Sequence, residues 1–282
     1  MVPADIGADS WSGMAVNGAL ATTVADLVVA HSVMAGEEPV PPGAPDRPLR
    51  IALSTRSPVP GVRADAATRA AVDDVVARLR AAGHTVVRRD PPISLGAAAG
   101  ALTRWMVGAH DDAEHLGLDR HALQARSRTH ARIGRLVRRA GLVRPRTAVR
   151  FRERMEGFFG DVDVLLSPVT TGPPLAARPW HERGFLANIT ANARWAPWTA
   201  AWNLAGLPAS VVPAGIRPDG LPAAVQFVGP PAPKGDYSGW PESWSVCSPG
   251  GATRPSSTPP HPPMPRPLPE LRSMAAGAAP GA

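Results

Sequence analysis

The sequence contains one lysine, Lys234, and one cysteine, Cys247, among its 282 residues. A lone cysteine excludes a disulfide framework and a cysteine-based zinc site within one chain. The sequence also lacks the GxxxxGK(S/T) and HExxH patterns. It therefore carries neither a loop that cradles nucleotide phosphates nor the helix of a zinc protease. We expect no cofactor and no resident metal.

Membrane and secretion signals are also missing from the sequence. No apolar run reaches the roughly 18 residues that a membrane-spanning helix needs. The N-terminus, MVPADIGADS, has neither the basic nor the apolar region of a signal peptide. We expect a cytoplasmic protein without a membrane partner.

The charge balance is basic, with a formal net charge of +7, and such a balance favours anionic partners in general. The basic residues between Arg126 and Arg154 interleave with apolar residues at helical spacing. They lack the alternating aromatic side chains of a surface that binds single strands. We therefore interpret them as solvated helix faces, and nucleic acid is not the expected partner.

Proline is abundant, with 34 residues, and it is concentrated between Gly229 and Pro269. Such a composition buries too little apolar surface to offset chain entropy. The predicted organisation is a folded domain over residues 1–231 and a disordered Pro/Gly/Ser-rich tail over residues 232–282.

Apolar periodicity predicts alternating strands and helices before this tail. A buried strand at 49–54, a helical pattern at 65–82 and the strand TVVRR indicate a βαβ unit with parallel strands. Three helical patterns fill 95–160, and the buried strand DVDVLLSP follows. The segments ASVVPAG and AAVQFVG form a strand pair whose turn contains Asp219 and Gly220. The expected fold class is α/β, a mixed β-sheet flanked by helices.

Two further helices are expected. Thr23 and Asp26 form a capping pattern at the start of one, and Gly36 is a typical terminator at its end. The stretch NARWAPWTAAWNLAG, residues 192–206, is predicted as the other. It would place its three tryptophans on one face and in the core.

The stretch HDDAEH, residues 110–115, places His110 with Glu114 and Asp111 with His115 at helical i,i+4 spacing. Two ligands on each of two faces do not complete a metal site. An exposed polar helix turn is the favoured interpretation.

The most specific pattern is PWTAAWNLAGLPASVVPAGIRPDGLPAAVQFVGPP, which runs from Pro197 to Pro231. It resembles the C-terminal block of the amidase signature family. The stretch DVDVLLSPVTTGPP and the stretch GADSWSGMAVNGALATTVADLVVAHSVMAG resemble two further blocks of that family, in the same order. The chain departs from the family at Ala19, where proline is usual, and at Thr22, where arginine is usual.

The resemblance implies hydrolysis of small-molecule amides by a serine nucleophile, a second serine beside a cis peptide bond and a lysine base. In the family these residues belong to the N-terminal half. Here the sole lysine is Lys234 in the tail, and the sole Ser-Ser pair, Ser256-Ser257, is flanked by prolines instead of glycines. We therefore expect the C-terminal part of an amidase-type layered domain, inactive alone. Trp202 and Asn203 are candidates for lining the substrate pocket, with packing as the favoured alternative role.

Two consequences and one alternative follow from this interpretation. Without the N-terminal half, an unpaired sheet edge and exposed apolar faces are expected, and a separately made N-terminal half could associate with them. A reading-frame shift near Ala232 would restore a family-like helix, since Asp236-Tyr237 then encodes leucine and Trp240-Pro241 alanine.

The alternative function is that of a non-enzymatic protein that binds an acidic partner or RNA through its arginine-rich helices.

Overall fold

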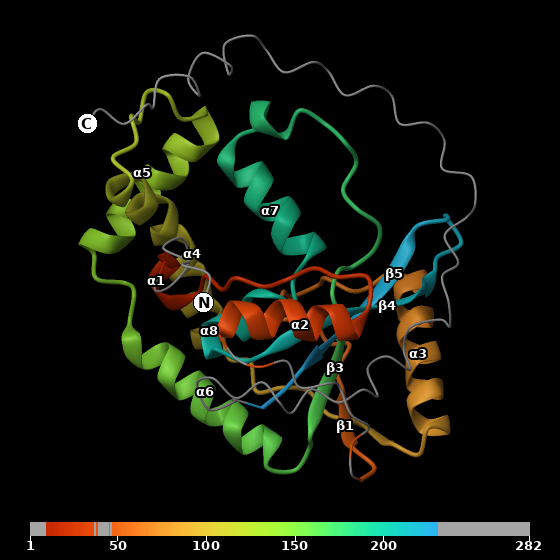
Figure 1. Ribbon diagram of the computed structural model, residues 1–282. Helices are drawn as coiled ribbons and strands as arrows, with labels where there is room; N and C mark the ends of the chain where they lie inside the picture. Colours follow the sequence, from red (N-terminus) through yellow and green to blue (C-terminus); the bar gives the residue numbers. More distant parts are fainter. Residues whose placement is uncertain (1–9, 37, 39–44, 46, 231–282) are drawn as a thin grey trace, which may run out of the picture. The chain divides into compact units, whose positions relative to one another are not determined.

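The computed structural model of the protein describes residues 10–36, 38, 45 and 47–230 (Figure 1). The predicted tail, residues 232–282, and the site of the proposed frame shift lie outside this part of the chain. The helices are α1 (Ser10–Gly13), α2 (Val24–Ala35), α3 (Ala66–Ala81), α4 (Leu95–His115), α5 (Ala125–Arg139), α6 (Pro145–Phe159), the 3-10 turn η1 (Trp180–Glu182), α7 (Phe185–Trp195) and α8 (Ala200–Ala205). The strands are β1 (Arg50–Leu53), β2 (Thr85–Arg88), β3 (Val164–Pro168), β4 (Ala209–Ile216) and β5 (Pro222–Val228).

The described strands form one mixed sheet in the order β2-β1-β3-β5-β4. β1 is parallel to both of its neighbours, with Ile51 opposite Val86 on one side and Val164 on the other. β5 is antiparallel to β3 and to β4. The α/β class, the βαβ unit and the C-terminal strand pair are therefore confirmed.

Side chains that alternate along the strands build a core on each face of the sheet. Ile51, Leu53 and Leu166 pack with Phe227 and the buried face of α3 on one side. On the other side, the strand residues between them pack with α4, α6 and α8. A strand buried on both faces reads as a continuous apolar run. This explains why all five residues of β3 are buried.

Helix α2 begins and ends where the sequence predicts. The Thr23 hydroxyl accepts a hydrogen bond from the Asp26 N–H at 3.1 Å, which satisfies one of the free donors of the first turn. Gly36 ends the helix with a φ of 76°, a left-handed conformation that favours glycine. The capping residues thus set both ends of this helix.

The single helix predicted over 192–206 is wrong, because the chain forms two helices there. α7 ends at Trp195 and α8 begins at Ala200. Pro197 lies between them, and a proline lacks the N–H that a continuous helix needs. Trp198 and Trp202 are nevertheless buried, at 2% and 1% exposure, although they do not share a helix.

Helices α4 and α5 pack closely, and α1 and α7 pack against this pair. The backbone of α5 approaches α4 at Gly134, where an added Cβ would overlap the carbonyl oxygen of Met106. Within the described residues, none of the helices has both the length and the apolar composition needed to cross a bilayer.

Candidate functional site

The two residues that the sequence suggests for a pocket, Trp202 and Asn203, lie side by side in α8. Trp202 is buried, and its Nε1 donates to Oε1 of Gln226 on β5 at 3.0 Å. Asn203 is exposed, and its Nδ2 donates to the Met14 carbonyl at 2.9 Å. Trp202 therefore packs α8 onto the sheet, and Asn203 ties the segment after α1 to α8. Their role in lining a pocket stays a prediction.

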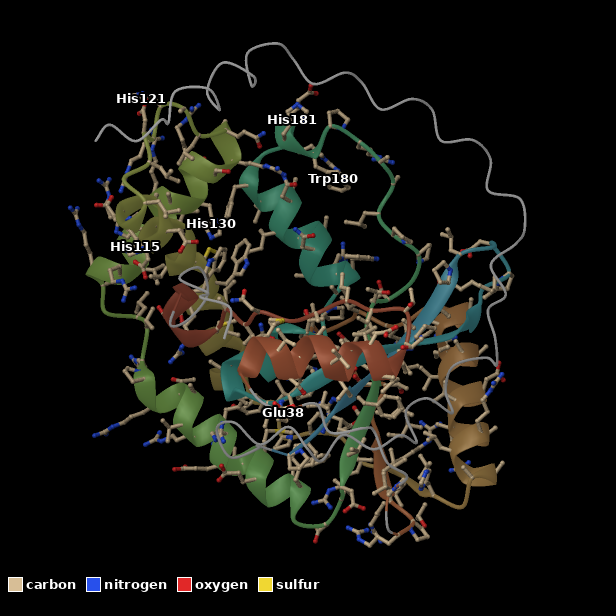
Figure 2. All side chains as sticks on the ribbon, in the orientation of Figure 1. Glu38, His115, His121, His130, Trp180 and His181 are labelled. Atoms are coloured by element: carbon tan, nitrogen blue, oxygen red, sulfur yellow. The ribbon has the colours of Figure 1, made fainter. Side chains whose placement is uncertain are left out.

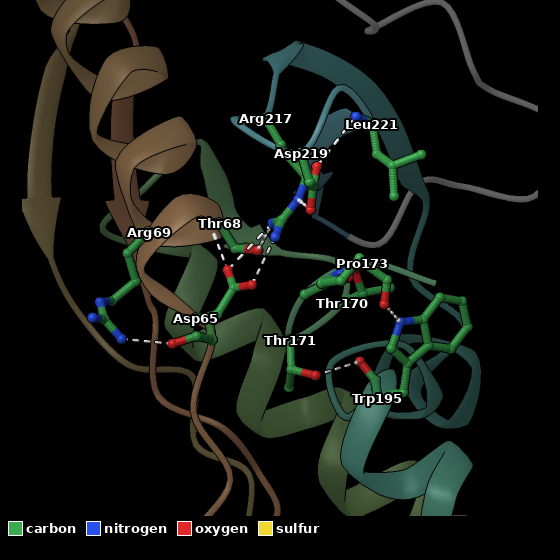
Figure 3. A network of polar contacts seen from close by, with 12 residues as sticks. Asp65, Thr68, Arg69, Thr170, Thr171, Pro173, Trp195, Arg217, Asp219 and Leu221 are labelled. Carbon is green, nitrogen blue, oxygen red and sulfur yellow. Dashed lines mark hydrogen bonds and ion pairs between the residues drawn. The ribbon is translucent and has the colours of Figure 1, made fainter. Parts of the chain in front are cut away.

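A polar junction, formed by Asp65, Thr68, Arg217 and Asp219, joins α3 to the β4–β5 turn (Figure 3). The Arg217 guanidinium donates to the Asp65 carboxylate at 2.7 and 3.3 Å and to the Thr68 hydroxyl at 2.8 Å. Its Nε donates to Asp219 at 3.2 Å. Asp65 also caps α3 by accepting the Thr68 N–H at 2.7 Å. One buried cation thus connects the first turn of a helix to a distant hairpin.

Charge within the polar junction is strongly stabilised. The hydrogen bond from Arg217 holds the pKa of the Asp65 carboxyl well below its usual range, and the Thr68 N–H acts in the same direction against partial burial. The same pair raises the pKa of Arg217. Both groups therefore stay ionised at neutral pH, so the junction holds structure and offers no titrating acid or base there.

The loop after β3 lies against this junction. The Thr171 carbonyl accepts the Asp65 N–H at 2.7 Å, and the Thr171 N–H donates to the Trp195 carbonyl at 2.8 Å. Trp195 Nε1 in turn donates to the Pro173 carbonyl at 2.8 Å (Figure 3). An added Cβ at Gly172 would approach the Asp65 carboxylate to 2.8 Å, so glycine allows the close contact. Backbone bonds thus fix this loop between α3 and α7.

Two buried serines of the described chain, Ser54 and Ser167, have hydrogen-bond acceptors other than a lysine. Ser54 donates to the Asp90 carboxylate at 2.7 Å, and Ser167 donates to the Pro168 carbonyl at 3.1 Å. The sole lysine of the sequence, Lys234, lies outside the described residues. A serine hydroxyl needs an adjacent proton acceptor to become a nucleophile. The described part of the chain therefore contains no serine–lysine pair.

The carboxylates of HDDAEH are occupied by contacts within the chain. Glu114 pairs with Arg120, which also lies 3.3 Å from His110 Nδ1, and Asp111 pairs with Arg138. Figure 2 shows the labelled histidines spread over separate elements. Among the residues that the structure covers, no three His, Cys, Asp or Glu side chains lie close enough to hold a metal ion.

His130 is buried among aromatic rings where α1, α4, α5 and α7 meet. Its imidazole stacks on Trp105 at 4.2 Å between ring centroids and lies 5.1 and 6.1 Å from Phe185 and Trp11. Nε2 lies 3.0 Å from the Trp105 carbonyl, and burial lowers the pKa of the imidazole. The imidazole of His130 is therefore neutral, and its role is to pack these helices together.

Positive charge gathers on two helices. α5 carries six arginines and no acidic residue, and α6 carries four arginines and two glutamates. Arg138 pairs with Asp111, and Arg152 pairs with Glu156. The other arginines make these helices the most basic elements of the described chain.

Sequence reasoning missed Arg217, the centre of the polar junction. Its partner Asp65 lies 152 residues away along the chain, and no local pattern connects the two positions. The signals that existed were Asp65 as a capping residue before α3 and the Asp219-Gly220 turn. Each predicts a local turn or cap, and neither predicts the long-range pair.

Comparison with known proteins identifies the family. The family model described as Amidase matches residues 2–234. The Mycobacterium tuberculosis (strain ATCC 25618 / H37Rv) proteins named "Putative amidase AmiB2" and "Putative amidase AmiA2" are 38% and 36% identical to the chain. Each match covers 79% of this chain, and 50% of AmiB2 and 49% of AmiA2. The chain thus spans about half the length of these relatives.

Solved structures agree on the fold. The 6-aminohexanoate cyclic dimer hydrolase superposes with a TM-score of 0.61 at 20% identity, over 80% of this chain and 52% of that one. A vestigial protein complex linked to an s-triazine catabolic enzyme superposes with a TM-score of 0.54 at 23% identity, over 82% and 51%. The family model, which matches residues 2–234, shows that the chain belongs to the amidase family.

Proposed function

We propose that this chain is one half of an amidase, which hydrolyses carboxylic amide C–N bonds when the other half of the amidase fold is supplied. The match to the family over residues 2–234, in a chain that covers about half of its relatives, supports this proposal. The substrate is a small-molecule amide, and the chain alone is inactive.

The proposed chemistry divides between the halves. The other half supplies a serine nucleophile, a second serine beside a cis peptide bond and a lysine. The lysine accepts the proton of the attacking hydroxyl and returns it to the departing amine, and water then releases the acid from the serine. This chain supplies the five-stranded sheet, and Trp202 and Asn203 line part of the pocket.

A fluorophosphonate probe, which reacts covalently with activated serines, tests this division. The complementary AmiB2 segment, defined as the part of M. tuberculosis AmiB2 outside its match to this chain, is co-expressed with the chain. We expect mass spectrometry to find the label on the complementary AmiB2 segment and none on the chain, alone or in the mixture. A labelled serine in this chain would contradict the proposal. A heat-denatured mixture serves as the control for nonspecific reaction.

A second candidate function rests on the basic helices. α5 and α6 together carry ten arginines and two glutamates, and such a surface attracts an acidic protein or RNA. Under this alternative the chain is a non-enzymatic interaction protein. Capture by immobilised polyanion that weakens steeply with salt, without amide hydrolysis in any mixture, would favour it.

We also propose that residues 232–282 are a tail separate from the amidase-like domain, with a shifted reading frame near Ala232, and that the protein is cytoplasmic. Resequencing the locus from well upstream of Met1 through the tail tests the frame. An extra or missing base near Ala232 is expected, and an unaltered frame would overturn this part of the proposal.

A further inference from the structure

The short segment α1 has a backbone conformation that two of its residues disfavour. Trp11 and Ser12 have φ angles of 55° and 54°, and Gly13 has a φ of 81°. Glycine adopts this left-handed region readily, whereas tryptophan and serine do so at a cost in free energy. The Ser12 hydroxyl is also buried without a hydrogen-bond partner among the described residues, which adds to the cost. Contacts elsewhere must therefore hold α1 in place.

The Trp11 side chain makes the contacts that hold α1. Its Nε1 donates to the Asp112 carboxylate on α4 at 2.8 Å. The ring lies against Gly108, where an added Cβ would come within 2.2 Å of it, so the glycine leaves the space that the ring fills. The ring centroid lies 6.1 Å from the centroids of both Trp105 and His130. Helix α1 is thus strapped to α4 and α5 through one indole.

The chain after α1 is anchored separately. Met14 is buried in the core, and its carbonyl accepts a hydrogen bond from Asn203 Nδ2 at 2.9 Å. Gly13 lies between this anchor and the strained pair, and an added Cβ there would meet nothing within 4 Å. The Met14 N–H donates to the Trp11 carbonyl at 3.3 Å, and a rotation at Gly13 would break this bond. Trp11 can therefore leave α4 while Met14 stays packed.

His130 is a titratable group in the surface that receives Trp11. Its Nε2 lies 3.0 Å from the Trp105 carbonyl, and because a carbonyl only accepts, Nε2 carries the proton of the neutral ring. A second proton would go to Nδ1. The described ion pairs of histidine involve His110 and His181, so His130 has no described carboxylate to balance a charge. A buried charge without a partner is costly.

Charged groups on the elements around His130 have partners of their own or add positive charge. The paired or hydrogen-bonded groups are Asp112 with Trp11, Asp111 with Arg138, Glu114 and His110 with Arg120, Arg104 with the Gly100 and Arg144 carbonyls, Arg128 with the His121 and Leu123 carbonyls, Arg126 with Asn188 of α7, and His181 with Glu182 of η1. Helix α1 has no titratable side chain. A charge on His130 would therefore add to α5, which carries six arginines and no acidic residue.

We propose that α1 is a pH-sensitive strap, in which protonation of His130 releases Trp11 from Gly108 while Met14 stays in the core. The strained backbone and the unpartnered Ser12 hydroxyl favour release of α1 over movement of α7. Helix α7 also contacts His130, but Asn188 and Trp195 fix it by further hydrogen bonds. The release needs no second half of the domain, so it is independent of the proposed function.

The direction of the pH effect follows from the burial of the imidazole. Burial lowers the pKa of His130 from its ordinary value of 6.5. A ring exposed by release keeps the ordinary pKa, so it binds the proton more tightly than the strapped ring does. Falling pH therefore favours release, beginning below about pH 6.5. The pH range in which Asp65 becomes protonated is lower, because the pKa of Asp65 is itself lowered from 3.8.

Nuclear magnetic resonance of the full chain between pH 7.5 and pH 4 tests the strap. The indole N–H signal of Trp11 is assigned with Trp11→Phe, and the His130 ring protons are followed in the same samples. Gly108→Ala supplies a reference for the released state, because the added Cβ displaces the Trp11 ring at any pH. We expect the wild-type Trp11 signal to reach the Gly108→Ala position as His130 titrates, with a midpoint below 6.5.

Three variants and two internal reporters separate the strap from other effects. His130→Gln should keep the Trp11 signal fixed over this range, whereas His121→Gln, at an exposed histidine, should behave like the wild type. Asp112→Asn keeps an acceptor for Trp11, and the transition should persist in it. The indole signals of the buried Trp198 and Trp202 should stay constant.

Four results would overturn the inference. They are a Trp11 signal that does not move, a movement that persists in His130→Gln, a simultaneous change at Trp198 and Trp202 that marks general unfolding, and a His130 pKa at or above 6.5. The last result would mean that the aromatic rings stabilise the charged imidazole, as a cation–π contact would.

Discussion

Arg217 connects two segments that are far apart in the sequence, the β4–β5 turn and the start of α3. It is buried, and its charge is balanced by Asp65 at the start of α3 and by Asp219 in the β4–β5 turn. A buried cation is costly unless it is paired and hydrogen-bonded. The Asp65–Arg217 pair therefore holds the β4–β5 hairpin in place against α3, which also contacts β4.

Replacing Asp65 separates its two roles. Asp65→Asn keeps a good capping side chain but removes the charge, whereas Asp65→Ala removes both. At pH 7 we expect Asp65→Ala to lower the free energy of unfolding by about 2–3 kcal/mol and Asp65→Asn by about 1–2 kcal/mol. Half-exposure of the carboxylate keeps these values moderate. Urea unfolding followed by circular dichroism measures them.

The pH dependence of these variants follows from the lowered pKa of Asp65. A carboxyl that ionises more readily in the folded chain stabilises it above the unfolded pKa of about 3.9, and this contribution is lost as pH falls below that value. The difference between wild type and Asp65→Asn should therefore shrink between pH 4.5 and pH 2.5. A difference that stays constant over this range would show that the ion pair does not contribute.

Residue patterns predicted what is local. Thr23, Asp26 and Gly36 marked the ends of α2, because a cap is made by neighbours in the chain. Arg217 could not be assigned a partner, because its contacts depend on the folded sheet bringing distant segments together. The pocket role of Trp202 and Asn203 stays a prediction, since a pocket depends on both halves of the domain.

At the scale of helices, close approach is set by glycine. Gly134 lets α5 contact the backbone of α4 at Met106, and Gly108 lets the Trp11 ring lie against α4. Periodicity predicted both helices but not their contact, because a glycine looks unfavourable in a helix considered alone. Pro197 ends a helix that the sequence pattern predicted to continue. The tryptophan spacing favoured one helix, but the chain forms α7 and α8 with Pro197 between them.

Alanine at Gly134 tests this packing against a matched control. Gly134→Ala should lower the free energy of unfolding by about 1–3 kcal/mol, because the carbonyl of Met106 cannot yield without moving α4. Gly157→Ala in α6 meets nothing within 4 Å and should raise it by about 0.5–1 kcal/mol through helix propensity. Urea unfolding of both variants gives the comparison. Equal stabilisation by both would mean that α4 and α5 are not in close contact.

At the scale of the molecule, the sheet class and the family could be predicted from the sequence, because apolar runs and turn motifs are encoded segment by segment. Apolar side chains of α2 and of the edge strand β4 are exposed in the described structure, and no local sequence pattern predicts which surfaces these are. These surfaces would be costly in water over a large area. Their presence is consistent with a domain that is completed by another half.

Amide hydrolysis by the chain, by the complementary AmiB2 segment and by the two together tests the central claim most directly. A panel of aliphatic and aryl amides is screened first with full-length AmiB2 to select substrates, and amine release is followed over time. We predict no hydrolysis above background by either part and measurable hydrolysis by the mixture. Hydrolysis by the chain alone, or none by a purified complex of the two, would contradict the account.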